Sequence, residues 1–216
     1  FFDQLCVQRF DDPSAEYCLI AKNIKLSDDR KSVIFTINEN ARYSDGTPVT
    51  VEDVAFTLQT LKSAEVHPHY QLYYQDITGS EVLDSHRIRF NFKQPNRELA
   101  MIAAQIPVFS KKSFAAWRNG DTKPVGSDLP IGSGPYVIEK VNLGKSITYK
   151  RNPDYWAGNH PVRKGQFNYD RITIKYYRDR TVALEAFKAG EFDILRVNIA
   201  KQWARDMDGP RFSSGE

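Results

Sequence analysis

The feature that most constrains the fold is a change of hydrophobic period on the two sides of one turn. Over residues 32–38 apolar side chains occupy alternate positions, which is the pattern of a half-buried strand. Residues 44–48 have the composition of a tight turn, because Gly46 accepts a positive φ and Pro48 offers no backbone donor. From 51 to 62 the apolar residues recur at helical spacing. The segment therefore predicts a strand, a turn and an amphipathic helix, and with them a mixed α/β fold.

The predicted helix has a defined beginning. Thr50 places a hydroxyl oxygen at the N-cap position, where it can accept a hydrogen bond from a free N–H of the first turn. Glu52 and Asp53 follow in that turn, where the helix dipole favours negative charge. We therefore predict that Thr50 caps this helix.

Strand and helix patterns alternate along the rest of the chain. We predict strands over residues 77–83, 87–92, 136–141, 146–151, 170–177 and 191–197. We predict short helices over residues 97–105, 111–119 and 182–189, the last capped by Thr181 and ended by Gly190. Residues 67–75 are expected to form a polar, aromatic loop and residues 120–131 a loop rich in Gly, Pro and Asp.

Charge and hydropathy exclude two classes of partner. The net charge is only +3, with 30 basic and 27 acidic residues mixed along the chain, so no footprint for nucleic acid is expected. No apolar stretch approaches the ~20 residues that cross a bilayer, so the chain is not expected to span a membrane. The content of 41% hydrophobic residues is enough for a packed core.

The search for catalytic groups predicts no enzyme. His67 and His69 form the only close histidine pair, and their spacing across Pro68 is not that of metal ligands on a helix. The run Gly132-Ser133-Gly134 is followed by proline and a strand pattern, which indicates a structural turn and not a phosphate cradle. No nucleophile motif or metal cluster stands out, and no cofactor is expected.

The two cysteines leave two alternatives open. Cys6 and Cys18 are either half-buried thiols in flanking elements or partners in a disulfide that closes the short loop between them. The disulfide would fit an oxidising compartment. Neither cysteine lies in a CxxC or CxxH setting, so a redox or zinc motif is not indicated.

Three sequence blocks, taken in order, resemble the family-5 extracellular solute-binding proteins, which bind di- and oligopeptides. They are FTINENARYSDGTPVTVEDV (35–54), GSGPY (132–136) followed by SITYKRNPDYW (146–156), and ALEAFKAGEFD (183–193). Shorter runs are similar to the branch that handles microcin C and murein-type peptides: NREL (96–99), FNYDRI (167–172) and YYRD (176–179).

The resemblance implies a two-lobe, periplasmic-binding-protein-like architecture. Residues 1–30 and 131–216 would form the core of the first lobe, and residues 31–130 an inserted, smaller α+β subdomain. The second lobe is expected to be absent. The chain begins without Met or a signal segment, and Phe1 to Leu5 already have the pattern of an ordered element, so we expect an N-terminal fragment of a longer protein.

The resemblance also implies ligand-binding segments. The expected contacts are Asp3, Gln4, Leu5 and Cys6, which would pair with an extended peptide through their backbone, the aromatic Tyr70, and Arg196, Val197 and Asn198. These segments are expected to share one exposed face. The alternative is that residues 3–6 form an ordinary internal strand and that Arg196 is a solvated surface charge.

The expected function is the capture of peptides or peptide-like solutes in the periplasm or another extracytoplasmic space, for delivery to the permease subunits of an ABC transporter. This 216-residue chain alone is expected to bind weakly or not at all, because one wall of the site would stay wet. Two alternatives come from other classes: a structural or docking module without its own ligand, and a secreted hydrolase.

Overall fold

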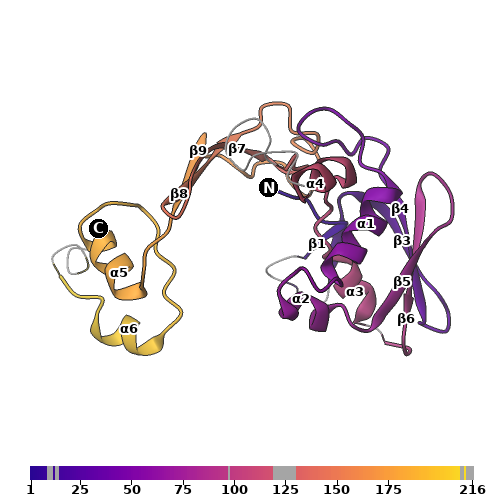
Figure 1. The fold of residues 1–216 in the computed structure, drawn as a ribbon, viewed down its shortest axis with the longest axis horizontal. Helices are drawn as coiled ribbons and strands as arrows, with labels where there is room; N and C mark the ends of the chain where they lie inside the picture. The colour runs from indigo at the N-terminus through magenta and orange to yellow at the C-terminus, as the bar shows by residue number, and fades with distance from the viewer. Residues whose placement is uncertain (9–11, 13–14, 97, 119–129, 210–211, 213–216) are drawn as a thin grey trace. The chain divides into compact units, whose positions relative to one another are not determined.

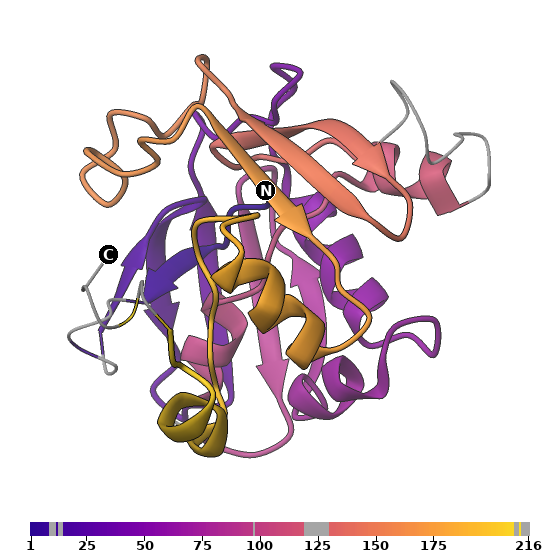
Figure 2. The same cartoon turned by 90° about the vertical axis from the view of Figure 1, so that its left-hand side faces the viewer.

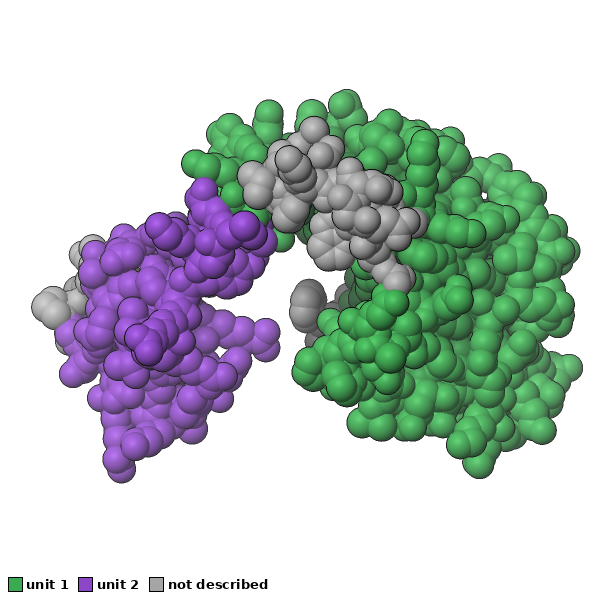
Figure 3. Space-filling view, in the orientation of Figure 1, with its two compact units in different colours: residues 1–141, 148–172 green, residues 142–147, 173–216 purple. Residues whose placement is uncertain are grey.

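The computed structural model describes the chain except for residues 9–11, 13–14, 97, 119–129, 210–211 and 213–216. It divides into two compact units, drawn in separate colours in Figure 3. The first unit consists of Phe1–Val141 with Thr148–Ile172, and the second of Asn142–Ile147 with Thr173–Glu216. The predicted limits at residues 30 and 130 do not coincide with this division, and the grouping into a lobe core and an inserted subdomain stays a prediction.

The first unit is built on a four-stranded antiparallel sheet. Its order is β3 (Ala21–Leu26), β4 (Ser32–Ile37), β6 (Arg87–Phe92) and β5 (Ile77–Val82). Alternation gives β4 and β6 one apolar face, which is buried, while Thr36 and Arg89 belong to the other face and are half-buried. The strands predicted at 32–38, 77–83 and 87–92 are therefore confirmed.

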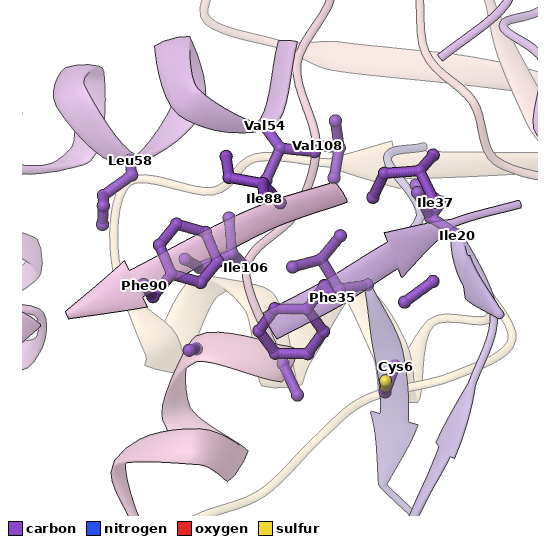
Figure 4. Close-up of a cluster of buried hydrophobic side chains, with 14 of the residues drawn as sticks. Cys6, Ile20, Phe35, Ile37, Val54, Leu58, Ile88, Phe90, Ile106 and Val108 are labelled. Carbon is purple, nitrogen blue, oxygen red and sulfur yellow. The ribbon is translucent and has the colours of Figure 1, made fainter. Parts of the chain in front are cut away.

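The main core lies between this sheet and helix α1 (Val51–Leu61). Figure 4 shows Val54 and Leu58 of α1 directed towards Ile88 and Phe90 of β6. The ring of Phe90 meets that of Phe35 from β4 edge-on, with centroids 5.6 Å apart. All five side chains are at most 2% exposed, so they anchor α1 to the sheet.

Helix α1 begins as predicted, at a capping box. The Asp53 N–H donates to the Thr50 hydroxyl oxygen over 3.3 Å, and the Thr50 N–H donates back to the Asp53 carboxylate over 3.0 Å. The second oxygen of Asp53 accepts from the N–H of Lys111 over 2.8 Å. One carboxylate therefore closes the start of α1 and ties it to α4 (Lys111–Arg118).

Replacing Thr50 with alanine is expected to lower the free energy of unfolding by about 1 kcal/mol, because the N–H of Asp53 loses its acceptor. Urea denaturation followed by circular dichroism measures this change. Thr181→Ala is the matched control, since Thr181 is exposed inside a helix and caps nothing, and it should shift stability by less than about 0.5 kcal/mol. Equal losses in the two variants would contradict the role of the cap.

Two smaller sheets and four further helices complete the described chain (Figures 1 and 2). The sheets consist of β1 (Cys6–Gln8) with β2 (Glu16–Cys18), and of β7 (Tyr136–Asn142), β8 (Ser146–Arg151) and β9 (Arg171–Lys175) in that order. The helices are α2 (Pro68–Tyr73), α3 (Leu99–Ala104), α5 (Arg180–Lys188) and α6 (Ala200–Arg205). The division between the units runs through the sheet of β7, β8 and β9.

Three local predictions were wrong. Asp179, not Thr181, caps α5: its carboxylate accepts from the N–H of Val182 over 2.9 Å. Residues 191–197 form no strand, because within the described chain they pair with no neighbouring strand. The segment predicted as a loop at 67–75 contains α2, whose first position is occupied by Pro68, where the missing N–H costs nothing.

Candidate ligand-binding site

The structure places residues 3–6 inside the first unit. Asp3, Leu5 and Cys6 are at most 2% exposed, and Gln4 is half-buried in a bridge with Pro107. The expectation of an exposed face is therefore wrong for this segment.

The backbone of the same segment is also engaged on both sides. On one side the Leu5 N–H donates to the Ile106 carbonyl over 3.3 Å. On the other side the Leu5 carbonyl accepts from the N–H of Leu19 over 3.0 Å. A strand with both edges paired cannot add an extended peptide, so the alternative of an internal strand is the one observed.

Asp3 is the centre of a buried polar cluster. Its carboxylate accepts from Arg163 (3.1 Å), from the Tyr155 hydroxyl (2.8 Å) and from the Trp156 indole N–H (3.2 Å), and its N–H donates to Ser133 Oγ (3.0 Å). Burial raises the pKa of Asp3, and Arg163 and Tyr155 act against that rise. The cluster fastens the start of the chain to a segment more than 150 residues away.

The run Gly132-Ser133-Gly134 belongs to the same region. The Gly134 N–H donates to the Phe1 carbonyl oxygen over 2.7 Å. A Cβ on Gly134 would lie 2.6 Å from that oxygen, and one on Gly132 would meet the same atom. The two glycines therefore let backbone approach backbone, which is a structural role.

An open pocket of about 640 Å³ lies beside this cluster in the first unit. It is lined by β8, the start of β9 and the connection between them. Its guanidinium groups are paired: Arg151 with Asp170 (2.6 Å), Arg171 with Glu139 (2.9 Å) and Arg163 with Asp3. Lys150 lines the pocket as well, and no pattern in the sequence predicted a pocket at this place.

Two of the predicted ligand residues meet in a smaller pocket of the second unit. Arg196 and Asn198 line it, together with the four residues Arg180, Ala183, Leu195 and Gln202. Its volume is about 80 Å³. In the part of the chain that the structure describes, no carboxylate lies within ion-pair distance of Arg180 or Arg196.

The other two predicted contacts lie elsewhere. Val197 lies between Arg196 and Asn198 in the sequence. Its side chain is half-buried and does not line the pocket. Tyr70 is 45% exposed on α2 in the first unit, where its ring lies edge-on to that of His69. That Tyr70 and Arg196 share one face of a ligand site stays a prediction.

The described residues hold no group of three or more His, Cys, Asp or Glu side chains that could bind a metal ion. His67 uses its Nδ1 to accept from the backbone N–H of His69, and so begins α2. No helix within the described ranges is both long and apolar enough to cross a bilayer.

The sequence of this chain is similar to those of known proteins of one family. Residues 17–213 match the sequence model of "Bacterial extracellular solute-binding proteins, family 5 Middle". The uncharacterized protein YejA of Escherichia coli is 36% identical over 211 residues, which cover 98% of this chain and 34% of that protein. The peptidoglycan-binding protein YepA of Agrobacterium fabrum is 34% identical over 195 residues, covering 89% of this chain and 31% of that protein.

Solved structures agree on the fold. The oligopeptide-binding protein AppA of Bacillus subtilis, solved in complex with a nonapeptide, matches with a TM-score of 0.71 at 19% identity. The match covers 95% of this chain and 40% of that one. The chain thus spans about a third of its curated relatives, 34% and 31% of their lengths. The family and the α/β fold class predicted from the sequence are confirmed: the chain belongs to the bacterial extracellular solute-binding proteins of family 5.

Proposed function

We propose that the protein captures peptides or peptide-like solutes, murein peptides among them, and delivers them to the permease subunits of an ABC transporter. Membership of family 5 supports solute capture, and the family's description as extracellular supports a periplasmic or other extracytoplasmic location. The names of two similar proteins, a peptidoglycan-binding and an oligopeptide-binding protein, support a peptide ligand.

The observation that carries this proposal is the pocket of the second unit. Arg180 and Arg196 supply planar, permanently charged guanidinium groups, and Asn198 and Gln202 supply amides that can both donate and accept. Guanidinium groups bind carboxylates in a bidentate manner, and peptides end in a carboxylate. This pocket is therefore suited to the C-terminal carboxylate of a bound peptide.

Tyr70 and Val197 are kept as proposed contacts. Tyr70 has an exposed aromatic face that can pack on a peptide side chain, and Val197 stands between the two polar pocket residues in the sequence. Residues 3–6 are left out, because their backbone groups already pair within the first unit.

Arg196→Ala is expected to weaken binding of a tripeptide with a free C-terminus by about tenfold, or ~1.4 kcal/mol, because a charged hydrogen bond to the carboxylate is lost. The affinity for the C-terminal amide of the same tripeptide should change little in this variant. A titration followed by NMR chemical shifts measures both, since it detects the weak affinity expected of this chain.

Arg205→Ala is the matched control. It removes the same charge from the second unit, but Arg205 is exposed in the last turn of α6 and does not line the pocket. Its affinity for both tripeptides should equal that of the unmodified protein. If Arg196→Ala weakens the free and the amidated tripeptide equally, the pocket does not recognise a carboxylate and the assignment is wrong.

A further inference from the structure

The two cysteines face each other across the small sheet of the first unit. Cys6 in β1 and Cys18 in β2 are directly opposite in the antiparallel register. The two Sγ atoms lie 3.3 Å apart, with the Cys6 thiol donating to the Cys18 sulfur. Sequence alone left their relation open, and the fold brings them into contact.

The register places this pair where a disulfide fits an antiparallel sheet. The Leu19 N–H donates to the Leu5 carbonyl over 3.0 Å. Leu5 and Leu19, which lie next to the cysteines, are therefore a hydrogen-bonded pair of the antiparallel register. Cys6 and Cys18 therefore occupy a non-hydrogen-bonded position, where Cα atoms stand about 4.5 Å apart. That separation falls within the range for disulfides, roughly 4.4–6.8 Å. Side-chain rotation can close the bond without moving either strand.

The two thiols differ in reactivity. Cys6 is fully buried, whereas Cys18 is half-buried. The hydrogen bond from Cys6 lowers the pKa of Cys18, while burial and the nearby Glu16 carboxylate act against that change. The same hydrogen bond, together with burial, raises the pKa of Cys6. Cys18 is thus the thiol that ionises first and the one that a reagent can reach.

We propose that Cys6 and Cys18 form a reversible cross-strand disulfide by exchange with a disulfide oxidant, a chemical class that includes oxidised glutathione and oxidoreductase proteins. This proposal depends on the proposed function only through the extracytoplasmic location. Such spaces are oxidising and would supply the oxidant. The bond would join β1 to β2 next to Asp3, which holds the start of the chain.

The exchange proceeds in two steps. The Cys18 thiolate attacks one sulfur of the oxidant, which forms a mixed disulfide and releases the other sulfur as a thiolate. Cys6 then loses its proton and attacks the Cys18 sulfur, so that the second thiolate leaves. Two electrons and the two thiol protons pass to the oxidant, which ends as two thiols, while the protein gains one S–S bond.

The test compares the purified protein after incubation with oxidised glutathione or with dithiothreitol. Each sample is then denatured and alkylated with iodoacetamide, and the mass of the intact protein is measured by mass spectrometry. Because the sequence holds two cysteines, the reduced protein should carry two alkyl groups. The oxidised monomer should carry none and be about 2 Da lighter than the unalkylated, reduced protein. Two alkylated thiols after oxidation, or a disulfide-linked dimer, would overturn the proposal.

Single variants test the order of the steps. Cys6→Ser should accumulate a glutathione adduct at Cys18, because the resolving thiol is gone. Cys18→Ser should react much more slowly, since Cys6 is buried. Equal adduct formation in both variants would contradict the assigned roles.

Thermal unfolding supplies the structural readout. Dithiothreitol should lower the Tm of the oxidised protein by roughly 5–10 °C, since the bond restricts the unfolded chain. The Tm of the double serine variant should not respond to dithiothreitol. A Tm of the oxidised protein that dithiothreitol leaves unchanged would show that the bond does not stabilise this sheet. None of these measurements uses a peptide ligand, so a failed disulfide and a failed peptide site are told apart.

Discussion

Asp3→Ala is expected to lower the free energy of unfolding by about 3–5 kcal/mol, because it leaves a guanidinium group without its carboxylate in the protein interior. The side chain of Asp3 is 2% exposed and that of its partner Arg163 is 15% exposed. Tyr155 would lose the acceptor of its hydrogen bond at the same time. Trp156 would lose one of two acceptors, since its indole N–H also donates to the Ser133 carbonyl oxygen over 3.1 Å. Urea denaturation followed by tryptophan fluorescence measures the loss, and Trp156 itself reports on the site.

A matched control separates this effect from charge removal in general. Asp170→Ala breaks an ion pair with Arg151 of 2.6 Å whose side chains are 80% and 49% exposed. Solvent screens such a pair, so its loss should cost less than about 1 kcal/mol. The double variant Asp3→Ala with Arg163→Leu should recover part of the stability, since no uncompensated charge remains. If Asp3→Ala costs no more than Asp170→Ala, the cluster does not anchor the start of the chain.

Gly134→Ala is expected to lower the free energy of unfolding by about 2–3 kcal/mol through overpacking. The added Cβ would lie 2.6 Å from the Phe1 carbonyl oxygen and 2.8 Å from its carbonyl carbon. Phe1 cannot simply move aside, because its carbonyl accepts from Gly134 and Asp3 is held two residues later. Urea denaturation again measures the change.

Gly79→Ala is the control for this prediction. Gly79 lies in β5, its φ is not positive and a Cβ there would meet nothing within 4 Å. Alanine at that position should leave stability unchanged or slightly higher, since it restricts the unfolded chain. An unchanged midpoint for Gly134→Ala would mean that the backbone of residues 1–3 moves freely, contrary to the packing described above.

Local patterns predicted the elements whose causes lie within one stretch of chain. The strand β4, the turn around Gly46 and the capped helix α1 follow from hydrophobic period and cap chemistry, which act over a few residues. The same patterns carried the resemblance to the family. Where two suitable residues compete locally, sequence does not decide: both Asp179 and Thr181 can cap a helix, and only the extended backbone of Asp179 (φ −148°, ψ 170°) shows which one does.

Of the residues that line the candidate ligand pocket, some were predicted from the sequence and others were not. Arg196 and Asn198 were predicted and do line one pocket, whereas Arg180 and Gln202 join it from two neighbouring helices. No sequence pattern singled out these last two residues, because arginine and glutamine are common on helices.

Sequence by itself therefore determined the family, the α/β class and the best-patterned elements, whose stabilising contacts are local. Tertiary structure alone decided the environment of residues 3–6. The pairing of Asp3 with Arg163 joins residues 160 apart, and the Leu5 backbone bonds to Ile106 across about a hundred residues. Such contacts form only when distant segments pack together, so no pattern within residues 3–6 could show that both edges of this strand are taken.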